Sequence, residues 1–333
     1  RRRAAAGSAE YWVRLPPVSG AADTVFRLYY GNAGAGDGAN AAEVWDAASV
    51  GVWHNADATA TNVADSTSWG NHGRKQAAGD PLQVEGVIGA AQRFDGYPDA
   101  VTLGTAGNPT NTFTLSAWVQ ATQAHEIDSQ STSGTAGTSG EKYAFYPPYG
   151  GTTGAGCGLS VGTNGISIYE HGDNHLPAVV AHAVALGTTW HHLAVVYSDR
   201  VPALYVDGAQ VRTGSASGRN PVTFSSRMGG DTYGYFPGMI DEVRKSSVAR
   251  SAAWLKAEHA AGQGTLVAIG EVPSTDTSML CGTVRDASTG AGVAGVRIWT
   301  DDATEAATTD ADGEYMVTNS PGWSGTLIPI CGD

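Results

Sequence analysis

Two dipeptides constrain the fold of this chain more than any other feature of its sequence. Asn164-Gly165 and Asp207-Gly208 each lie between two short, largely apolar runs. Asn-Gly and Asp-Gly readily adopt the positive φ angles of type I′ turns, which join neighbouring antiparallel strands. Each pair therefore predicts a β-hairpin. Residues 112–120 alternate, with Phe113 and Leu115 on one face, and this pattern predicts a further strand.

The composition is typical of a protein built from many short strands. Of the 333 residues, 45 are Gly and only 15% are charged. We expect one dependable helix, from about Ser251 to Ala261, with Ser251 as its N-cap and Gly262 as its stop. Many strands with one late helix predict an all-β sandwich. We assign Trp118, Trp190 and Trp254 to its core.

Charge and hydropathy exclude two classes of partner. The net charge is −13, and the three leading arginines are the only basic cluster. A phosphate-tracking basic stripe is missing, so nucleic acid is not an expected partner. No apolar run approaches the roughly 20 residues of a membrane-spanning helix, so we expect no membrane span.

The chain divides into four segments. Residues 1–50 contain two expected strands, at 11–15 and 25–30, and residues 51–265 show regular strand and turn signals. Residues 266–279 read as a linker, and residues 280–333 contain four further strands, at 280–284, 296–300, 315–318 and 326–330. Both outer segments hold fewer strands than a complete β domain. We expect either a trimmed or processed chain, because no signal peptide is visible at residue 1, or domains that are completed by another chain.

Three cysteines are too few for a disulfide scaffold. Cys281 and Cys331 flank the last segment and form a candidate disulfide, although spacing alone does not establish the required geometry. Cys157 would then be left without a partner.

Four motifs in the middle of the chain carry a family resemblance. They are FTLSAW at 113–118, WHHLAVVY at 190–197, LYVDG at 204–208 and GMIDEVR at 238–244. Together they resemble the LamG-like jelly-roll family of the concanavalin A-like lectin/glucanase superfamily, over about residues 51–265. Residues 1–50 resemble the end of an uncharacterised domain. Residues 280–333 resemble the start of a carboxypeptidase-regulatory-like, transthyretin-type β-sandwich, in part only.

The resemblance implies a fold, a location and a metal. It implies a jelly-roll sandwich in a secreted or cell-surface protein, and a structural calcium site formed by Asp65, Asn71 and Asp241. Calcium takes six to eight oxygen ligands, which carboxylates, amides and loop carbonyls supply. The alternative is an Asx-turn at Asp65 and a solvated Asp241.

Aromatic residues on both sides of the Asn164-Gly165 turn are the candidate ligand contacts. Tyrosine rings offer a large contact area with little conformational freedom to lose. The set comprises Tyr143, Tyr146, Tyr149, Tyr169, His171 and Asn174. The alternative is that these rings wedge long loops onto the sandwich.

We therefore expect a non-enzymatic, extracellular binding or adhesion protein whose partner is a glycan or another cell-surface polymer. The alternative is a structural subunit that assembles with copies of itself into a fibre by β-strand or domain complementation. A glycoside hydrolase is a more distant alternative, because the paired carboxylates of such enzymes are not evident at strand spacing. Asp241 and Glu242 are adjacent, so we expect them to point to opposite faces of a strand.

Overall fold

A computed structural model describes residues 10–15, 24–26, 28, 34, 36, 38–58, 61–77, 80–267, 278–301, 305–319 and 326–330. The chain forms two compact units, Arg1–Val267 and Ala268–Asp333. The division falls inside the predicted linker.

The first sheet of the larger unit is antiparallel throughout and contains eight of the described strands, in the order β14-β13-β12-β7-β19-β5-β4, with β1 paired to β19. The bounds are β1 (Ser49–Trp53), β4 (Leu82–Glu85), β5 (Ala90–Asp95), β7 (Phe113–Ala121), β12 (His191–Ser198), β13 (Val201–Val206), β14 (Ala209–Thr213) and β19 (Pro237–Ser246).

The second sheet contains nine described strands, in the order β11-β10-β9-β8-β16-β6-β3-β2, with β15 paired to β9. The bounds are β2 (Asn62–Val63), β3 (Gly73–Lys75), β6 (Val101–Thr102), β8 (Tyr143–Phe145), β9 (Ala155–Gly162), β10 (Gly165–His171), β11 (Ala178–Ala183), β15 (Val222–Thr223) and β16 (Arg227–Met228). A separate hairpin joins β17 (Gly230–Asp231) to β18 (Gly234–Tyr235). The helices of this unit are α1 (Ala41–Val44), the 3₁₀ turn η1 (Ala136–Thr138) and α2 (Ala252–Gly262).

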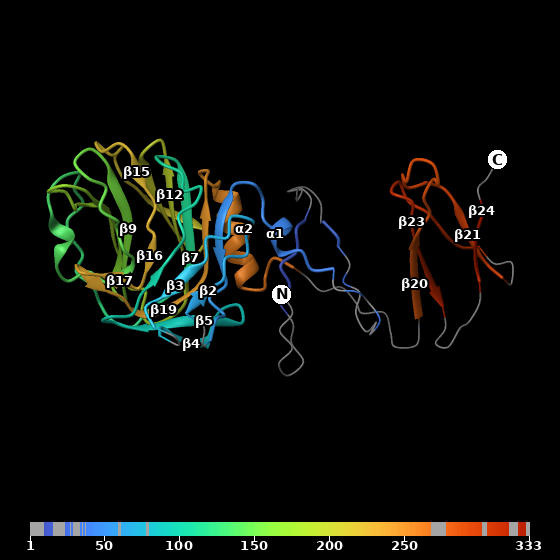
Figure 1. Cartoon of the computed structure of the whole chain (residues 1–333), viewed down its shortest axis with the longest axis horizontal. Helices are drawn as coiled ribbons and strands as arrows, with labels where there is room; N and C mark the ends of the chain where they lie inside the picture. The colour runs from blue at the N-terminus through green and yellow to red at the C-terminus, as the bar shows by residue number, and fades with distance from the viewer. Residues whose placement is uncertain are drawn as a thin grey trace. The chain divides into compact units, whose positions relative to one another are not determined.

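The two sheets face one another as the layers of a sandwich (Figure 1). The predicted alternation is observed on β7, where Phe113 and Leu115 point into the core between the sheets. Trp118 lies on the outer face of the same strand, beneath the end of α2. A Cβ at Gly262 would lie 2.6 Å from its ring, so a side chain there would push the helix off the sheet. The expected all-β jelly-roll sandwich is confirmed.

Both predicted hairpins are present, but only one uses the expected turn. Asp207 and Gly208 have φ angles of 51° and 77°, as a type I′ turn requires. In the other hairpin Gly165 pairs with Gly162, so Thr163 and Asn164 are the loop residues. The type I′ assignment is wrong there, because neither of these two residues has a positive φ.

Helix α2 begins where the sequence predicts and ends one residue later, because Gly262, the predicted stop, is its last residue and Gln263 is the C-cap. The Ser251 hydroxyl accepts a hydrogen bond from the Trp254 amide at 3.2 Å, which confirms the N-cap. Leu255 is its buried residue. Trp254 is 46% exposed and lies over the Arg250 guanidinium, so its assignment to the core was wrong. Trp118 is buried as expected, and Trp190 is half-buried.

The residues before β1 differ from the prediction. The expected strand at 11–15 is not formed, and the described part of the expected strand at 25–30 has no strand either. Trp12 and Trp45 instead pack on His54, which follows β1. In the part of the chain that the structure describes, no helix is long and apolar enough to cross a bilayer.

The smaller unit is a small β-sandwich with its own core. Its strands are β20 (Ser278–Thr283), β21 (Arg297–Thr300), β22 (Glu305–Thr308), β23 (Glu314–Asn319) and β24 (Leu327–Ile330). β20 pairs with β23, and β22-β21-β24 form the second sheet around Val296, Ile298 and Val317. The four predicted strands are present, and β22 was not predicted. The resemblance to a carboxypeptidase-regulatory-like domain remains a prediction.

Candidate functional site

Two glycines on β9 allow the aromatic loop, residues 146–149, to lie on the outer face of the second sheet. A Cβ at Gly158 would lie 2.4 Å from the Pro147 ring, and one at Gly156 would lie 1.9 Å from the Pro148 carbonyl oxygen. Larger residues at these two positions would therefore lift residues 146–149 off the strand. The sequence thus places Tyr146 and Tyr149 beside the end of β10.

His171 is the centre of the resulting aromatic group. Its ring centroid lies 5.4 Å from that of Tyr149, 5.4 Å from that of Tyr233 and 6.5 Å from that of Tyr146, in each case edge to face. Its Nδ1–H donates a hydrogen bond to the Pro147 carbonyl at 3.0 Å, which fixes the orientation of the ring. We call these four residues the aromatic face. Tyr149 is 61% exposed, so the face is open to solvent.

The structure corrects two of the predicted ligand contacts. Tyr143 and Tyr169 are fully buried, so neither presents a ring face to a ligand. The Tyr143 hydroxyl donates to the Gly137 carbonyl at 2.7 Å, and the Tyr169 hydroxyl donates to Asp128 at 2.7 Å. Burial raises the pKa of both phenols. They hold the loop at residues 122–142 against the sheet, as the alternative interpretation proposed.

Asn174 and Tyr233 are two further residues at the aromatic face. Asn174 is exposed in the turn after β10, with a φ of 48°, and remains a predicted contact. Sequence reasoning did not place Tyr233 among the ligand contacts. It lies between β17 and β18, and its ring stacks on Tyr146 with centroids 6.1 Å apart. The Tyr-Gly-Tyr pattern at 233–235 was the available signal.

The predicted calcium ligands Asp65 and Asn71 lie together, but their oxygens are already used. Asp65 Oδ1 accepts the amides of Val52 and Thr67 at 2.9 and 3.0 Å. Its Oδ2 accepts the Thr67 hydroxyl and the Asn71 amide, both at 2.8 Å. A carboxylate offers about four acceptor positions, and all are occupied here. Asn71 Oδ1 accepts the Ala106 amide at 2.8 Å. These side chains do not fit a calcium ion and instead shape the loop, as the Asx-turn alternative proposed.

Asp241 lies elsewhere, and the solvated alternative does not describe it. It is fully buried on the outer face of β19, where its oxygens accept the amides of Ile88 and Glu242 at 3.0 and 2.7 Å. Burial, followed by the charge of Glu242, raises its pKa to about 8. Among the described residues, no three His, Cys, Asp or Glu side chains are grouped to hold one metal ion. The calcium site remains a prediction without support from these residues. Cys281 is exposed, and the proposed Cys281–Cys331 pair stays untested because Cys331 lies outside the described residues.

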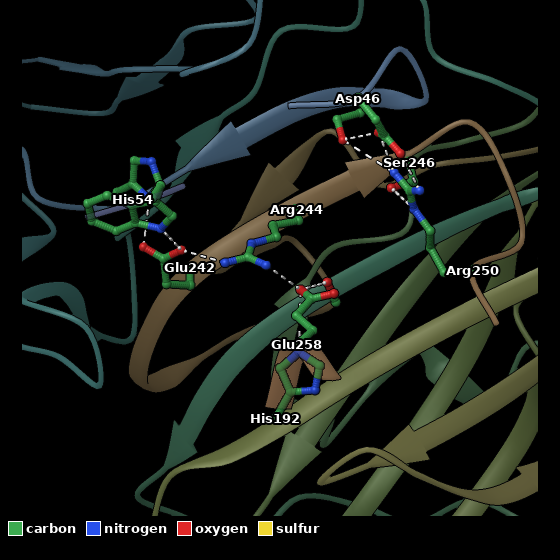
Figure 2. A network of polar contacts seen from close by, with 11 residues as sticks. Asp46, His54, His192, Glu242, Arg244, Ser246, Arg250 and Glu258 are labelled. Carbon is green, nitrogen blue, oxygen red and sulfur yellow. Dashed lines mark hydrogen bonds and ion pairs between the residues drawn. The ribbon is translucent and has the colours of Figure 1, made fainter. Parts of the chain in front are cut away.

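A buried polar network links β19 to α2 and to the residue after β1 (Figure 2). His54 Nδ1 lies 2.6 Å from Glu242 Oε1, and Glu242 Oε2 lies 3.0 Å from Arg244. Arg244 also reaches Glu258 at 3.3 Å, and Glu258 lies 3.5 Å from His192. The pairing register of β19 shifts between Asp241 and Arg244, and Glu242 has a φ of 48°. This β-bulge re-aims Glu242, so the expected simple alternation of Asp241 and Glu242 does not hold.

The electrostatics of the network favour a structural role over acid–base chemistry. Burial alone would raise the pKa of Glu258, but Arg244 and His192 outweigh it and lower the pKa to about 2. His54 and Arg244 likewise lower the pKa of Glu242 against the effect of burial. A general acid needs a raised pKa and must be accessible to a substrate. Arg244 instead lies between the two carboxylates (Figure 2).

A known protein family matches the central part of this sandwich. Residues 95–256 match the concanavalin A-like lectin/glucanases superfamily. The matching family model is a laminin G model, so the resemblance predicted for about residues 51–265 is confirmed over residues 95–256, which we call the laminin G-like domain. The matched range includes the aromatic loop, β9, β10 and β19. No curated protein matches the chain.

Several solved structures are similar to the chain at low sequence identity. One is domain 4 of AbnA, an extracellular arabinanase from Geobacillus stearothermophilus, in complex with arabinotriose, with 15% identity, a TM-score of 0.43, and 62% of this chain and 96% of that chain covered. Another is the binding domain of Paraclostridial Mosquitocidal Protein 1, with 10% identity, a TM-score of 0.48 and coverages of 84% and 73%. A third is botulinum neurotoxin type C, from work on its interaction with two ganglioside molecules, with 10% identity, a TM-score of 0.43 and coverages of 65% and 51%.

Proposed function

We propose that the laminin G-like domain is a non-enzymatic binding module that contacts glycans through the aromatic face. The observation that carries the proposal is the open, pre-oriented group of rings around His171, with Tyr149 61% exposed. Sugar rings present C–H faces that stack on tyrosine, while the histidine supplies a polar ring edge. Rings that are already held in place lose little conformational freedom on binding.

The membership of residues 95–256 in a lectin and glucanase superfamily supports the class of ligand. A fold alone does not identify a ligand, so the site has to carry that part of the proposal. Adhesion at a cell surface or in the extracellular space follows from this ligand class, because polymeric glycans are found there. The buried carboxylates beside Arg244 support binding rather than hydrolysis.

The test is a glycan array followed by titration of the best-bound sugar. Tyr149→Ala should weaken binding about tenfold, which corresponds to about 1.4 kcal/mol. Tyr233→Ala should weaken it similarly, while Tyr149→Phe should retain most of the affinity because the ring face remains. Trp254→Ala is the matched control, since this exposed aromatic lies on α2, away from the second sheet.

Two results would count against the proposal. If the wild-type chain bound no glycan on the array, the ligand class would be wrong. If a sugar bound but both Tyr149→Ala and Tyr233→Ala left its affinity unchanged, the aromatic face would not be the site.

A structural role in a fibre is the second candidate, and one observation favours it. Among the described residues, β24 pairs only with β21, and Ile328 and Ile330 on it are exposed. An apolar edge strand is a template for a strand from another chain. Pro329 removes one amide donor from this edge, which is why we rank the fibre second.

A further inference from the structure

Four polar atoms are buried without a hydrogen-bond partner beneath the loop at residues 122–142. They are both carboxylate oxygens of Glu141, Oγ of Ser167 and Nε2 of His125. Glu141 is 1% exposed, Ser167 is fully buried and His125 is nine-tenths buried. Buried polar groups without partners are rare in native proteins and often mark an ion or ordered water. Neither the aromatic face nor the network of Figure 2 uses these groups.

Short contacts place these residues in one neighbourhood. The Lys142 amide donates to Ser160 Oγ at 2.9 Å, and His125 Nδ1 lies 2.8 Å from the same oxygen. Ser160 is the direct cross-strand partner of Ser167. Ser167 and Tyr169 lie two residues apart on β10 and therefore project from the same face of the sheet.

Asp128 brings a second carboxylate to Glu141. Its Oδ2 accepts the Tyr169 hydroxyl at 2.7 Å. Burial raises the pKa of Glu141 to about 7, and the side chain of Asp128, which contacts it, adds to the increase. Two neighbouring carboxylates repel each other unless a cation or a shared proton lies between them.

The loop that carries both acids is held in place before any ion binds. The Glu126 amide donates to the Gly140 carbonyl at 3.0 Å, which closes the loop on itself. Asn164 accepts the His125 amide at 3.0 Å and donates to its carbonyl at 2.9 Å, so the loop is clamped to the β9–β10 hairpin. Asp128 is half-buried, so the pair is partly accessible to solvent on its side.

We propose that a calcium ion binds between the carboxylates of Asp128 and Glu141, beneath the loop at residues 122–142. Calcium suits this site because the groups on offer are hard oxygens and because it accepts bidentate carboxylates together with carbonyls, hydroxyls and water. Two carboxylates neutralise its charge. The site is distinct from the Asp65, Asn71 and Asp241 set that the sequence suggested. Its occupation does not depend on glycan binding.

Terbium luminescence is the direct probe. Tb³⁺ replaces Ca²⁺ at oxygen sites, and its emission is excited through nearby tyrosine rings. Tyr143 and Tyr169 lie beside the pair, so the full chain should sensitise bound Tb³⁺, and added Ca²⁺ should reverse the signal. Glu141→Gln should weaken Tb³⁺ binding at least tenfold. The exposed acid Glu126 on the same loop provides the matched control, Glu126→Gln, which should bind as the wild type does.

A melting experiment separates loss of binding from loss of folding. Calcium should raise the melting temperature of the wild type above its value in EDTA, and should leave that of Glu141→Gln unchanged. In EDTA the variant should melt no lower than the wild type, because it removes an unpaired buried carboxylate and keeps its shape. Neither readout involves a sugar, so this proposal and the glycan proposal fail independently.

Three results would overturn the calcium proposal. The first is a wild-type chain that shows neither Tb³⁺ emission nor a calcium-dependent melting temperature, which would mean that the acid pair holds a shared proton only. The second is a Glu141→Gln variant that binds as tightly as the wild type. The third is a calcium response that survives Glu141→Gln but is lost in Asp65→Asn, which would return the ion to the loop of the sequence prediction.

Discussion

The groups around His191 favour its protonated form. Its Nδ1–H donates to Asp207 at 2.8 Å, and its Nε2–H donates to the Leu186 carbonyl at 3.1 Å. The hydrogen bond to Asp207 raises the pKa of His191. Burial alone would raise the pKa of Asp207, but the hydrogen bonds from His191 and the His192 amide outweigh it and lower the pKa. Asp207 thus serves both the type I′ turn and an ion pair.

Asp207→Asn separates these two roles, because Asn also tolerates a positive φ in the turn. A raised His pKa stabilises the fold below the ordinary value of about 6.5, and this stabilisation is lost as the pH rises through the raised pKa. The free energy of unfolding of the wild type should therefore be about 1 kcal/mol higher than that of the variant between pH 5 and 6. This value is reduced for the partial exposure of Asp207. The difference should shrink above neutral pH. Urea unfolding at several pH values measures it.

Asp199→Asn is the control for this prediction. Asp199 also has a positive φ, at 45°, but its side chain is 90% exposed. The substitution should leave unfolding almost unchanged at every pH. A stability difference for Asp207→Asn that does not vary with pH would contradict the ion-pair account.

At the scale of elements, α2 is fastened to the outer face of the first sheet by Glu258. Besides Arg244, the carboxylate accepts the Ser116 hydroxyl from β7 at 2.7 Å. Around the other end of the network, Arg250 donates to both oxygens of Asp46 at 2.6 and 2.7 Å, and to Ser246 at 2.9 Å (Figure 2). The helix and the segment before β1 are therefore tied to β7 and β19 by charge as well as by apolar contact.

Glu258→Gln should destabilise the domain by about 3 kcal/mol, because it leaves Arg244 and His192 with one anion fewer in a buried site. Ionised Glu258 stabilises the fold above its ordinary pKa, and this stabilisation is lost as the pH falls toward the lowered value of about 2. The deficit of the variant should therefore shrink below pH 4. Lys256→Ala, at an exposed position on the same helix, should change stability by less than about 0.5 kcal/mol. An equal loss in both variants would contradict this account.

The elements that the sequence predicted are those fixed by local chemistry. The Asp207-Gly208 turn and the Ser251 cap depend on neighbouring residues and were predicted correctly. The bulge at Glu242, with a φ of 48°, was not predicted, because the Glu242 side chain is bonded to His54, which lies 188 residues away in the sequence. Trp254 was misplaced for a similar reason, since only the docking of α2 decides which face is covered.

The same distinction applies to the candidate sites. Sequence reasoning placed six residues at one surface, but loop packing decided that Tyr169 is covered and Tyr149 is exposed. The sequence analysis did not predict a role for Glu141. Its significance comes from burial without partners, which only the packing of a 21-residue connection between β7 and β8 produces. The sequence shows the chemistry of these side chains, but it does not show which of them are exposed to solvent.

At the scale of the whole molecule, the described residues before β1 belong to the larger unit. Trp12 Nε1 donates to Glu242 at 3.4 Å, and Arg244 lies over the Trp45 ring at 5.3 Å. The predicted boundary at residue 50 therefore separates groups that pack together. The smaller unit has its own core around Val296, Ile298 and Val317, so each unit has the apolar centre of an independent domain.

The smaller unit is where the fibre hypothesis can be tested. If β24 accepts a strand from another copy, the full chain should form polymers whose size grows with concentration, and a fragment of residues 10–267 should stay monomeric while melting cooperatively. Ile328→Lys places a charge on the apolar edge and should suppress assembly. Leu82→Lys is the control, because Leu82 is an exposed residue on β4, an edge strand of the first sheet. Sedimentation velocity measures both, and a monomeric full chain at high concentration would leave glycan binding as the remaining function.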